Sequence, residues 1–269
     1  MPTPFFDLRG SHNPHRWHLP LTPEVCVGPP GNMFMYGGVG LAASISALEQ
    51  TCGRPVIWAT AQYLSYARPP SVVDFDVRIA AAGKYTTQAR VSGHVGEGEI
   101  ITVNAALGAR PGGETRQWPK MPMMPPPEDC DPILLWPDQG QNLNRRLEIR
   151  TAGGAYGIDS RTGQPSEDGR MQMWLRTVEE FPIDASLLAV FADYVPSGLG
   201  PALGVQGGGN SLDNTLRVLK IVPTRWVLAD ISISGVHAGV GHGEMNIFAQ
   251  TGELMAVASQ SMIVRLRED

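Results

Sequence analysis

Two stretches of this sequence, 154 residues apart, resemble each other, and this repeat constrains the fold more than any other feature. Val73–Ala106 aligns without a gap with Val227–Gln260. The identical pairs are Val73/Val227, Asp76/Asp230, Ile79/Ile233, Gly98/Gly252, Glu99/Glu253 and Val103/Val257. Both copies also carry a similar turn, EGEI in the first and TGEL in the second. Self-similarity at a fixed offset indicates a chain built from two copies of one unit.

A proline-rich segment separates the two copies. Residues 109–140 read ARPGGETRQWPKMPMMPPPEDCDPILLWPDQG. Proline fixes φ and lacks the N–H that helices and sheets need, so this segment is expected to be an extended connector. The sequence therefore predicts three parts: an N-terminal repeat over 1–108, a connector over 109–140 and a C-terminal repeat over 141–269.

Each repeat shows short strands, one helix and then a series of strands. The first has a helical pattern over Gly38–Thr51, and the second has one over Ala185–Tyr194 with Asp184 as a plausible N-cap. Strand patterns in the first cover Arg16–Leu21, Asn32–Tyr36, Val56–Tyr66, Val72–Ala81, Thr86–Gly93 and Ile100–Leu107. Those in the second cover Leu143–Arg150, Met171–Val178, Thr215–Ile221, Trp226–Ser234, Gly243–Gln250 and Met255–Val264. The order predicts an α+β fold in which each repeat is a curved antiparallel sheet wrapped around a central helix. Joining the two sheets edge to edge would cover two exposed edges.

Composition narrows the classes of partner. The formal net charge is −5 and no dense basic run occurs, so no nucleic acid is expected as a partner. Three widely spaced cysteines, Cys26, Cys52 and Cys130, predict neither a disulfide framework nor a zinc site. The N-terminus does not read as a signal peptide, and no apolar run approaches the roughly 20 residues that cross a bilayer. We therefore expect a soluble, cytoplasmic protein without a membrane partner.

The order of these elements, with three local motifs, resembles the double-hotdog acyl-CoA thioesterase II family. The motifs are the glycine pair Gly37–Gly38 before the first helix, SLDNTLRV at Ser211–Val218 and VASQSMIVR at Val257–Arg265. Trp226–Gln250 also fits the long β-hairpin of that family, whose first strand carries a Ser or Thr. The resemblance implies a double hotdog of two tandem repeats, a role in fatty acid metabolism, hydrolysis of acyl-CoA thioesters and no cofactor. Proteins of this kind commonly assemble further, so a homo-oligomer is left open.

Carried across by the resemblance, the hydrolytic residues fall on Asp213, Ser234 and Gln260. Ser232, two residues earlier on the same strand face, is an alternative to Ser234. The sequence departs from the family at Asn214, where His is common, and at Val39, where Gln is frequent.

These residue types suit the hydrolysis of a thioester. An ionised Asp can accept a proton from water, while a Gln amide and a Ser hydroxyl hold that water in place. Backbone N–H groups of Gly37, Gly38 and Val39 at a helix N-terminus could receive the oxyanion. The predicted site would combine the first helix with the second sheet.

The repeat alignment predicts that only one such site is present. Ser234 aligns with Ala80, Gln260 aligns with Ala106, and Asp213 falls near Ala61. A methyl group can neither orient water nor accept a proton. The first repeat is therefore expected to serve as a scaffold.

Structural roles remain open for several of these residues. Asp213 could cap a strand, Gln260 could face outward from an edge strand, and Gly204–Asn210 is expected to be a flexible turn. The histidines of HNPHRWH resemble a metal cluster, but Pro14 and the strand-like neighbours argue against a shared helix face, so no metal site is predicted. Two functions compete with hydrolysis: a hotdog hydratase or dehydratase, and a non-catalytic acyl-CoA binding protein. The former would need an Asp–His pair that the sequence does not place where the fold requires it.

Overall fold

The computed structural model describes residues 5–133, 140–154 and 164–266. Its helices are α1 (Gly37–Cys52), α2 (Ala185–Ala192) and α3 (Leu199–Leu203), with short 3-10 turns at Pro23–Val25, Pro127–Asp129, Leu143–Arg146 and Val195–Gly198. The strands before the connector are β1 (Arg9–Gly10), β2 (Arg16–Pro20), β3 (Cys26–Val27), β4 (Phe34–Met35), β5 (Val56–Tyr63), β6 (Val72–Ala82), β7 (Thr86–Val95) and β8 (Gly98–Gly108). Those after it are β9 (Leu147–Gly153), β10 (Arg170–Thr177), β11 (Gly207–Ser211), β12 (Asp213–Val218), β13 (Val227–His237), β14 (Val240–Ala249) and β15 (Leu254–Leu266).

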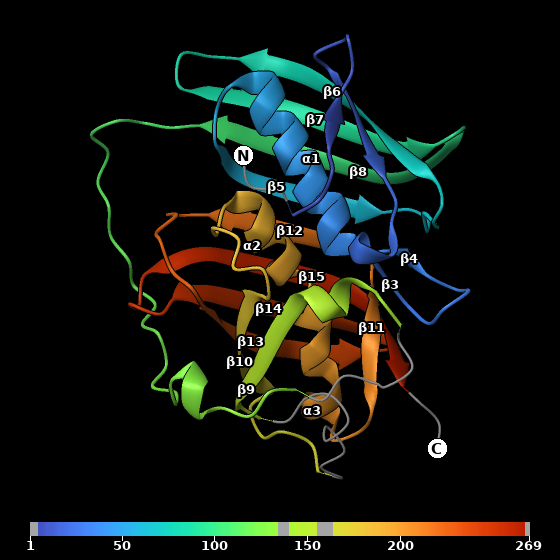
Figure 1. Ribbon diagram of the computed structural model, residues 1–269. Coiled ribbons are helices and arrows are strands. Elements are labelled where there is room, and N and C mark those ends of the chain that lie inside the picture. Colours follow the sequence, from blue (N-terminus) through green and yellow to red (C-terminus); the bar gives the residue numbers. More distant parts are fainter. Residues whose placement is uncertain (1–4, 134–139, 155–163, 267–269) are drawn as a thin grey trace.

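One antiparallel sheet runs through both portions of the described chain (Figure 1). Its strand order is β1-β2-β6-β7-β8-β5-β12-β15-β14-β13-β10-β9, with β11 paired to β15. The first portion supplies β6-β7-β8-β5, and the second supplies the same succession in reverse, β12-β15-β14-β13. The predicted edge-to-edge junction is confirmed, since β5 pairs with β12 from Asp213↔Gln62 to Arg217↔Trp58.

The two main helices lie on the same side of this sheet and contact each other (Figure 1). In α1 every residue from Gly38 to Ile45 is buried, which is the pattern of a helix enclosed on all sides. α2 is buried throughout, and its predicted N-cap is confirmed, because the Asp184 side chain accepts a 2.8 Å hydrogen bond from the Leu187 N–H. One apolar core extends across both portions and includes residues of α1 and α2, while a smaller cluster around Trp174, Trp226 and Phe248 packs against Met121 and Met124 of the connector.

The glycine-rich run Gly204–Asn210 differs from the expectation of a flexible turn. Gly207–Ser211 forms β11, which pairs with the end of β15 from Gly207↔Leu266 to Ser211↔Met262. The glycines permit a close approach there, since a Cβ on Gly209 would lie 2.7 Å from the Met262 side chain. Leu143–Arg146 also differs: it is a 3-10 turn rather than the start of a strand.

The strand register corrects one detail of the repeat alignment. Gln260 pairs with Gly243 in the second portion, and Ala89, which aligns with Gly243, pairs with Ala105 in the first. The structural counterpart of Gln260 is therefore Ala105 and not Ala106. The irregularities of the two hairpins lie at aligned positions, between Gly93 and His94 and between Ile247 and Phe248. The shift of one residue arises in the turn, because Val95 pairs with Gly98 whereas the aligned Ala249 is hydrogen-bonded to Glu253, which leaves one more residue between them.

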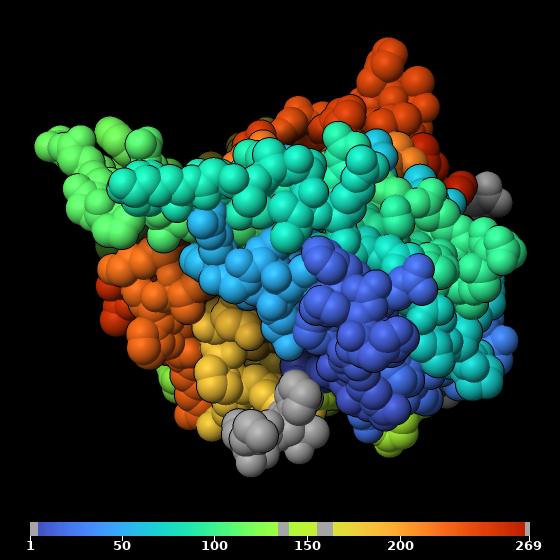
Figure 2. Space-filling model, turned by 90° about the horizontal axis from the view of Figure 1, so that it is seen from above, coloured from blue at the N-terminus to red at the C-terminus, as the bar shows by residue number. Residues whose placement is uncertain are grey.

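The proline-rich connector runs along the outside, as expected for a segment that cannot join a sheet (Figure 1), and it protrudes at one corner in green in Figure 2. Residues 134–139 of the predicted connector lie outside the described residues. The rest is tied to the second portion: Gln117 accepts a 2.7 Å hydrogen bond from the Leu254 N–H, and Trp174 Nε1 donates to the Pro125 carbonyl over 2.9 Å.

Within the described ranges, no helix has the length and apolar character needed to span a bilayer. All three cysteines are free thiols.

Candidate active site

The N-terminus of α1 meets the C-terminus of α2, and a buried carboxylate lies at this meeting point. Asp193 follows the last residue of α2, and its Oδ2 accepts a 2.7 Å hydrogen bond from the Gly38 N–H. The glycines make this approach possible. A Cβ on Gly38 would lie 2.9 Å from the Asp193 Cβ and 3.0 Å from the Ala189 carbonyl oxygen, and a Cβ on Gly37 would lie 2.9 Å from Asp193 Oδ2.

The sheet of the second portion supplies two further partners of this carboxylate. Gln260, on β15, is buried and donates from Nε2 to Asp193 Oδ1 over 2.6 Å. Ser211, at the end of β11, places its hydroxyl 3.4 Å from the same oxygen. Asp193 thus receives donors from α1, β11 and β15, which ties three distant segments together.

Burial and hydrogen bonding act in opposite directions on this carboxyl. Desolvation raises the pKa of Asp193 from 3.8 to about 6, although hydrogen bonds from Gln260, Gly38 and Ser211 favour the charged form. A carboxyl with a pKa near 6 is largely ionised at neutral pH yet still basic enough to take a proton. Such tuning is typical of a general base.

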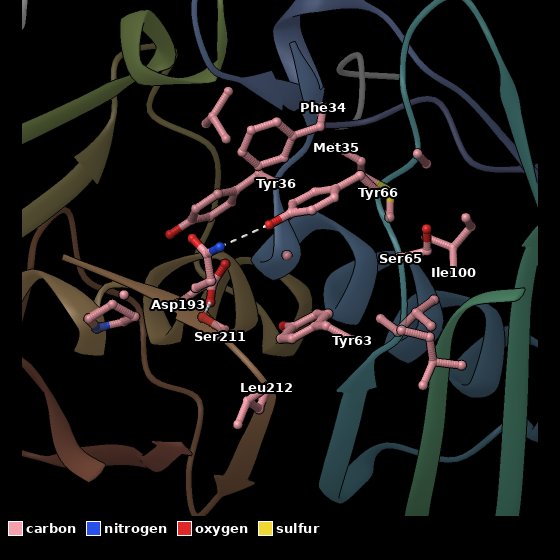
Figure 3. A pocket seen from close by; sticks show the side chains of 18 of the residues that line it. Phe34, Met35, Tyr36, Tyr63, Ser65, Tyr66, Ile100, Asp193, Ser211 and Leu212 are labelled. Carbon is pink, nitrogen blue, oxygen red and sulfur yellow. Dashed lines mark hydrogen bonds between the residues drawn. The ribbon is translucent and has the colours of Figure 1, made fainter. Parts of the chain in front are cut away.

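A cavity of about 430 Å³ opens beside Asp193 (Figure 3). Asp193 and Ser211 lie together on the left of Figure 3, Tyr63 lies to their right, and the rings of Phe34, Tyr36 and Tyr66 lie above them. The remaining lining is largely apolar and includes Met35, Ile100, Ile101, Leu212 and Ile263. An apolar cavity with a few convergent polar groups at one end is the usual form of a small-molecule site.

Of the predicted water-holding trio, only Gln260 reaches this site. Asp213 accepts a 2.6 Å hydrogen bond from the Ser261 N–H and caps the strand irregularity between β11 and β12. Ser234 is exposed near the tip of the β13–β14 hairpin. Its alternative, Ser232, lies in the row of Glu244 and Ser259 on the outer face of the sheet. The expectation that Asp213, Ser234 and Gln260 point into one cavity is therefore wrong.

The glycine pair has a different hydrogen-bonding role from the expected one. Gly38 N–H, predicted as an oxyanion donor, is directed at Asp193, and Val39 N–H donates to the Tyr36 carbonyl over 3.0 Å. Gly37 lines the cavity. Its N–H is in the first turn of α1, where helix N–H groups have no acceptor within the helix. Gly37 is thus the member of the predicted group best placed to face a ligand.

Sequence reasoning missed Asp193 and Ser211. Ser211 stood inside the motif that carried the resemblance, two residues before Asp213. Asp193 had a signal of its own, because a carboxylate at the C-terminal end of an apolar helix is opposed by the helix dipole. A residue that breaks a local preference in this way is expected mainly at functional sites.

The histidines lie elsewhere. All six are in the described part of the chain, and none lines the cavity beside Asp193. His15 Nδ1 lies 3.1 Å from the Val77 carbonyl, and His18 Nδ1 lies 2.8 Å from Asp74 on the outside of β6. No Asp–His pair therefore stands at the candidate site.

Comparisons with known proteins place this geometry in context. Residues 127–264 match the family model described as the acyl-CoA thioesterase C-terminal domain. No curated protein sequence matches the chain significantly.

Solved structures resemble the whole chain. A protein assigned as a thioesterase from Novosphingobium aromaticivorans is 33% identical, with a TM-score of 0.85, over 96% of this chain and 98% of that one. A hot dog fold protein of unknown function from Alicyclobacillus acidocaldarius has a TM-score of 0.83 at 17% identity, over 97% of both chains. The acyl-CoA thioesterase II TesB2 of Mycobacterium marinum has a TM-score of 0.73 at 19% identity, also over 97% of both.

Proposed function

The chain belongs to the acyl-CoA thioesterase family and is a thioester hydrolase, and from this premise we propose that it hydrolyses acyl-CoA to a free acid and coenzyme A by means of a water held at Asp193. The observation that carries the proposal is the buried Asp193 carboxylate, hydrogen-bonded to Gln260 and Gly38 at the end of an apolar cavity. Asp193 and Ser211 take the places that the sequence suggested for Asp213 and Ser234. The fold behind this arrangement is a double hotdog, in which α1 and α2 are the central helices of two tandem repeats.

The hydrolysis follows from the positions of these groups. The acyl chain lies in the apolar part of the cavity, with the thioester carbonyl at the Asp193 end. A water between Asp193 and Ser211 attacks the carbonyl carbon while its proton passes to the carboxylate. The Gly37 N–H at the start of α1 stabilises the negative charge on the carbonyl oxygen. When the C–S bond breaks, the thiolate of coenzyme A leaves and takes the proton back from Asp193.

The hydrogen bonds to Asp193 fix its orientation as well as its basicity. Gly38 N–H holds Oδ2, while Gln260 Nε2 holds Oδ1, so the carboxylate cannot rotate freely. The Ser211 hydroxyl forms the longest of these hydrogen bonds, at 3.4 Å, and Ser211 lines the cavity. Its hydroxyl can therefore release the carboxylate and hydrogen-bond a water in the cavity instead.

A hydratase or dehydratase on this fold is less well supported. Such an enzyme would move a proton at carbon with an Asp–His pair, and no histidine among the described residues lines the cavity. A binding protein without catalysis would have no need for a buried carboxyl whose pKa is raised to about 6.

The test is hydrolysis of a panel of acyl-CoA thioesters from short to long chains, scored by the release of free thiol. We expect thiol release that depends on enzyme concentration and is about 10²–10⁴-fold slower in Asp193→Asn. Binding of acyl-CoA without thiol release across the panel would leave only the binding function. Hydration of an enoyl-CoA without thiol release would favour the dehydratase class.

A further inference from the structure

Four buried polar atoms cluster next to Asp193 without a hydrogen-bond partner. They are the Tyr63 hydroxyl, both the nitrogen and the oxygen of the Asn214 amide, and Oε1 of Gln260. Across the residues that the structure describes, these are all the buried side-chain atoms of this kind. Buried polar groups are normally paired, so a cluster of four at one place calls for a functional explanation.

The register of three adjacent strands brings these side chains together. Thr215 pairs with Ser259, which places Asn214 beside Gln260 on the inner face of β12 and β15. On the other side, Asn214 pairs with Ala61 of β5, and Tyr63 lies two residues farther along the same face. Cross-strand neighbours and their diagonal neighbours on one face are within contact of each other. Tyr63, Asn214 and Gln260 therefore form a row across the junction of the two portions.

Asn214 is out of character for its position. It is fully buried on β12, and the next inward residue on that strand is the buried Leu216. Asparagine is unfavourable in strands, and its amide loses its contact with water there. The Asn214 side chain acts on the Tyr63 hydroxyl and opposes the rise in its pKa, which is caused by burial and by the nearby Asp193 charge. These side chains thus already interact electrostatically.

We propose that Asn214 and Tyr63 are positioning residues that hold the Gln260 amide in the one orientation that donates to Asp193. The catalytic consequence of this inference rests on the proposed function. A Gln amide has a donor end and an acceptor end, and Nε2 faces Asp193 only while Oε1 faces away from it. In this row the Asn214 amide and the Tyr63 hydroxyl carry donor hydrogens without an acceptor, and Gln260 Oε1 is an acceptor without a donor. If the amide turned over, Oε1 would face the Asp193 carboxylate and the hydrogen bond would be replaced by repulsion.

Other ionisable groups lie near Asp193, Tyr63 and Gln260, and they also bear on the pH dependence. Tyr36 at the N-cap of α1, Tyr194 next to Asp193, Tyr63 on β5 and Asp213 on β12 are the titratable neighbours, while β15 contributes the Gln260 amide. Tyr63 is neutral over the pH range in which this carboxyl titrates, because burial raises its pKa well above the usual value. A change in the titration of Asp193 after removal of a neutral neighbour therefore reports on its hydrogen bonds.

The variants are Tyr63→Phe, which removes one oxygen atom, and Asn214→Leu, which replaces the amide with an apolar group of similar size. The matched control is Thr215→Val, because Thr215 is also largely buried and adjoins Asn214, yet its hydroxyl bonds Thr60 on the opposite face of the same two strands. We expect kcat to fall roughly tenfold in each variant with little change in KM. We also expect the acidic limb of the kcat profile to move to higher pH, because a Gln260 hydrogen bond that favours the carboxylate is weakened. Thr215→Val should keep the wild-type limb.

Nuclear magnetic resonance separates this inference from the proposed function. The Asp193 carboxyl carbon (Cγ) and the Gln260 side-chain amide can be followed by isotope labelling whether or not the protein hydrolyses any thioester. The inference predicts a higher Asp193 midpoint and a less protected Gln260 amide in Tyr63→Phe and Asn214→Leu, with Thr215→Val unchanged. A wild-type midpoint and amide signal in folded Tyr63→Phe would overturn it, even in an active enzyme. If Asn214→Leu does not fold, Tyr63→Phe alone decides.

Discussion

The Gly38 N–H and the Asp193 carboxylate are joined by a 2.7 Å hydrogen bond although 155 residues separate them in the chain. Gly38 is the second residue of α1 in the first portion, and Asp193 is the C-cap of α2 in the second. The base proposed for hydrolysis is therefore oriented by a backbone group from the other half of the molecule. The predictions below follow from this shared corner and from the groups around it.

Replacing Asp193 tests the assignment of the base. Asp193→Asn should lower kcat by about 10²–10⁴-fold, since a neutral amide cannot take a proton from water. Asp213→Asn is the matched control, because Asp213 is also a carboxylate that accepts a backbone N–H but lies at the strand irregularity. It should keep activity close to wild type while costing about 1 kcal/mol of stability. Steady-state kinetics and thermal melting measure both, and the reverse ranking would return the role to Asp213.

The activity should depend on pH through the same group. Since the pKa of Asp193 is raised to about 6, kcat/KM should increase with pH and level off above that value. In Ser211→Ala the limb should move to higher pH, because the Ser211 hydrogen bond lowers the pKa of Asp193. A limb near pH 4 in the wild type would indicate a solvated carboxylate as the base instead.

The contribution of Asp193 to stability should fall as pH rises through the same range. The pKa of Asp193 is about 6 in the folded protein against 3.8 as the ordinary value, so the unfolded chain loses its proton first. The stability contributed by the protonated group is complete below pH 3.8 and is lost as pH rises through 6, by about 3 kcal/mol in total. Denaturant unfolding of wild type and Asp193→Asn at pH 4.5 and pH 7.5 measures the difference. Asp193→Asn should gain on the wild type as pH rises, and parallel pH dependence would contradict the burial of a charge.

The glycine at the helix junction should tolerate no side chain. Gly38→Ala places a methyl group 2.8 Å from Tyr36 Cε1 and 2.9 Å from Asp193 Cβ, so α1 and α2 must move apart. Overpacking of this kind costs about 1–3 kcal/mol, and it should lower kcat because Asp193 is displaced. Gly235→Ala is the control, since a Cβ there has no neighbour within 4 Å and the position is exposed. Normal kcat in a well-folded Gly38→Ala would show that the two portions do not share one site.

The first portion should not regain a site from one polar residue. Ala105 is the buried structural counterpart of Gln260, so Ala105→Gln places an amide among apolar side chains without a carboxylate to receive it. The cost should be at least about 1–3 kcal/mol, and kcat per chain should not rise. Ala80→Ser, on the exposed β6–β7 hairpin, should leave stability near wild type. A rise in kcat for Ala105→Gln would indicate a second, latent site.

The elements with strong local patterns were predictable from sequence. Alternating apolar residues predicted β6, β7 and β13–β15 closely, and Asp184 indicated the start of α2. β11 was not, because three glycines and an asparagine have no strand preference, and only pairing with β15 orders them. Local pattern also does not show that the β14–β15 turn is one residue longer than the β7–β8 turn, which is why the aligned partner of Gln260 was displaced by one residue.

The site was predictable only in part for a related reason. Gln260 and Gly38 were found through the motifs around them, but Asp193 lies 67 residues from one and 155 from the other. The residues next to Asp193 at the end of α2 do not indicate which side chains it contacts in the folded protein. Asp213 was the more conspicuous carboxylate because it follows Ser211 in the motif, yet alternation along the strand turns it toward the Ser261 backbone instead.

The difference between the Gln260 position and the corresponding Ala105 position also affects how the sequence of such a protein can evolve. When two identical chains form a symmetric dimer, any substitution appears at both equivalent positions, so a residue needed in one site is kept in the other. Here Gln260 and Ala105 occupy corresponding positions but are encoded separately. The position of Ala105 can therefore take the residue that packs best, while Gln260 is retained for its hydrogen bond to Asp193. Because both portions lie in one chain, a substitution in one leaves the other unchanged.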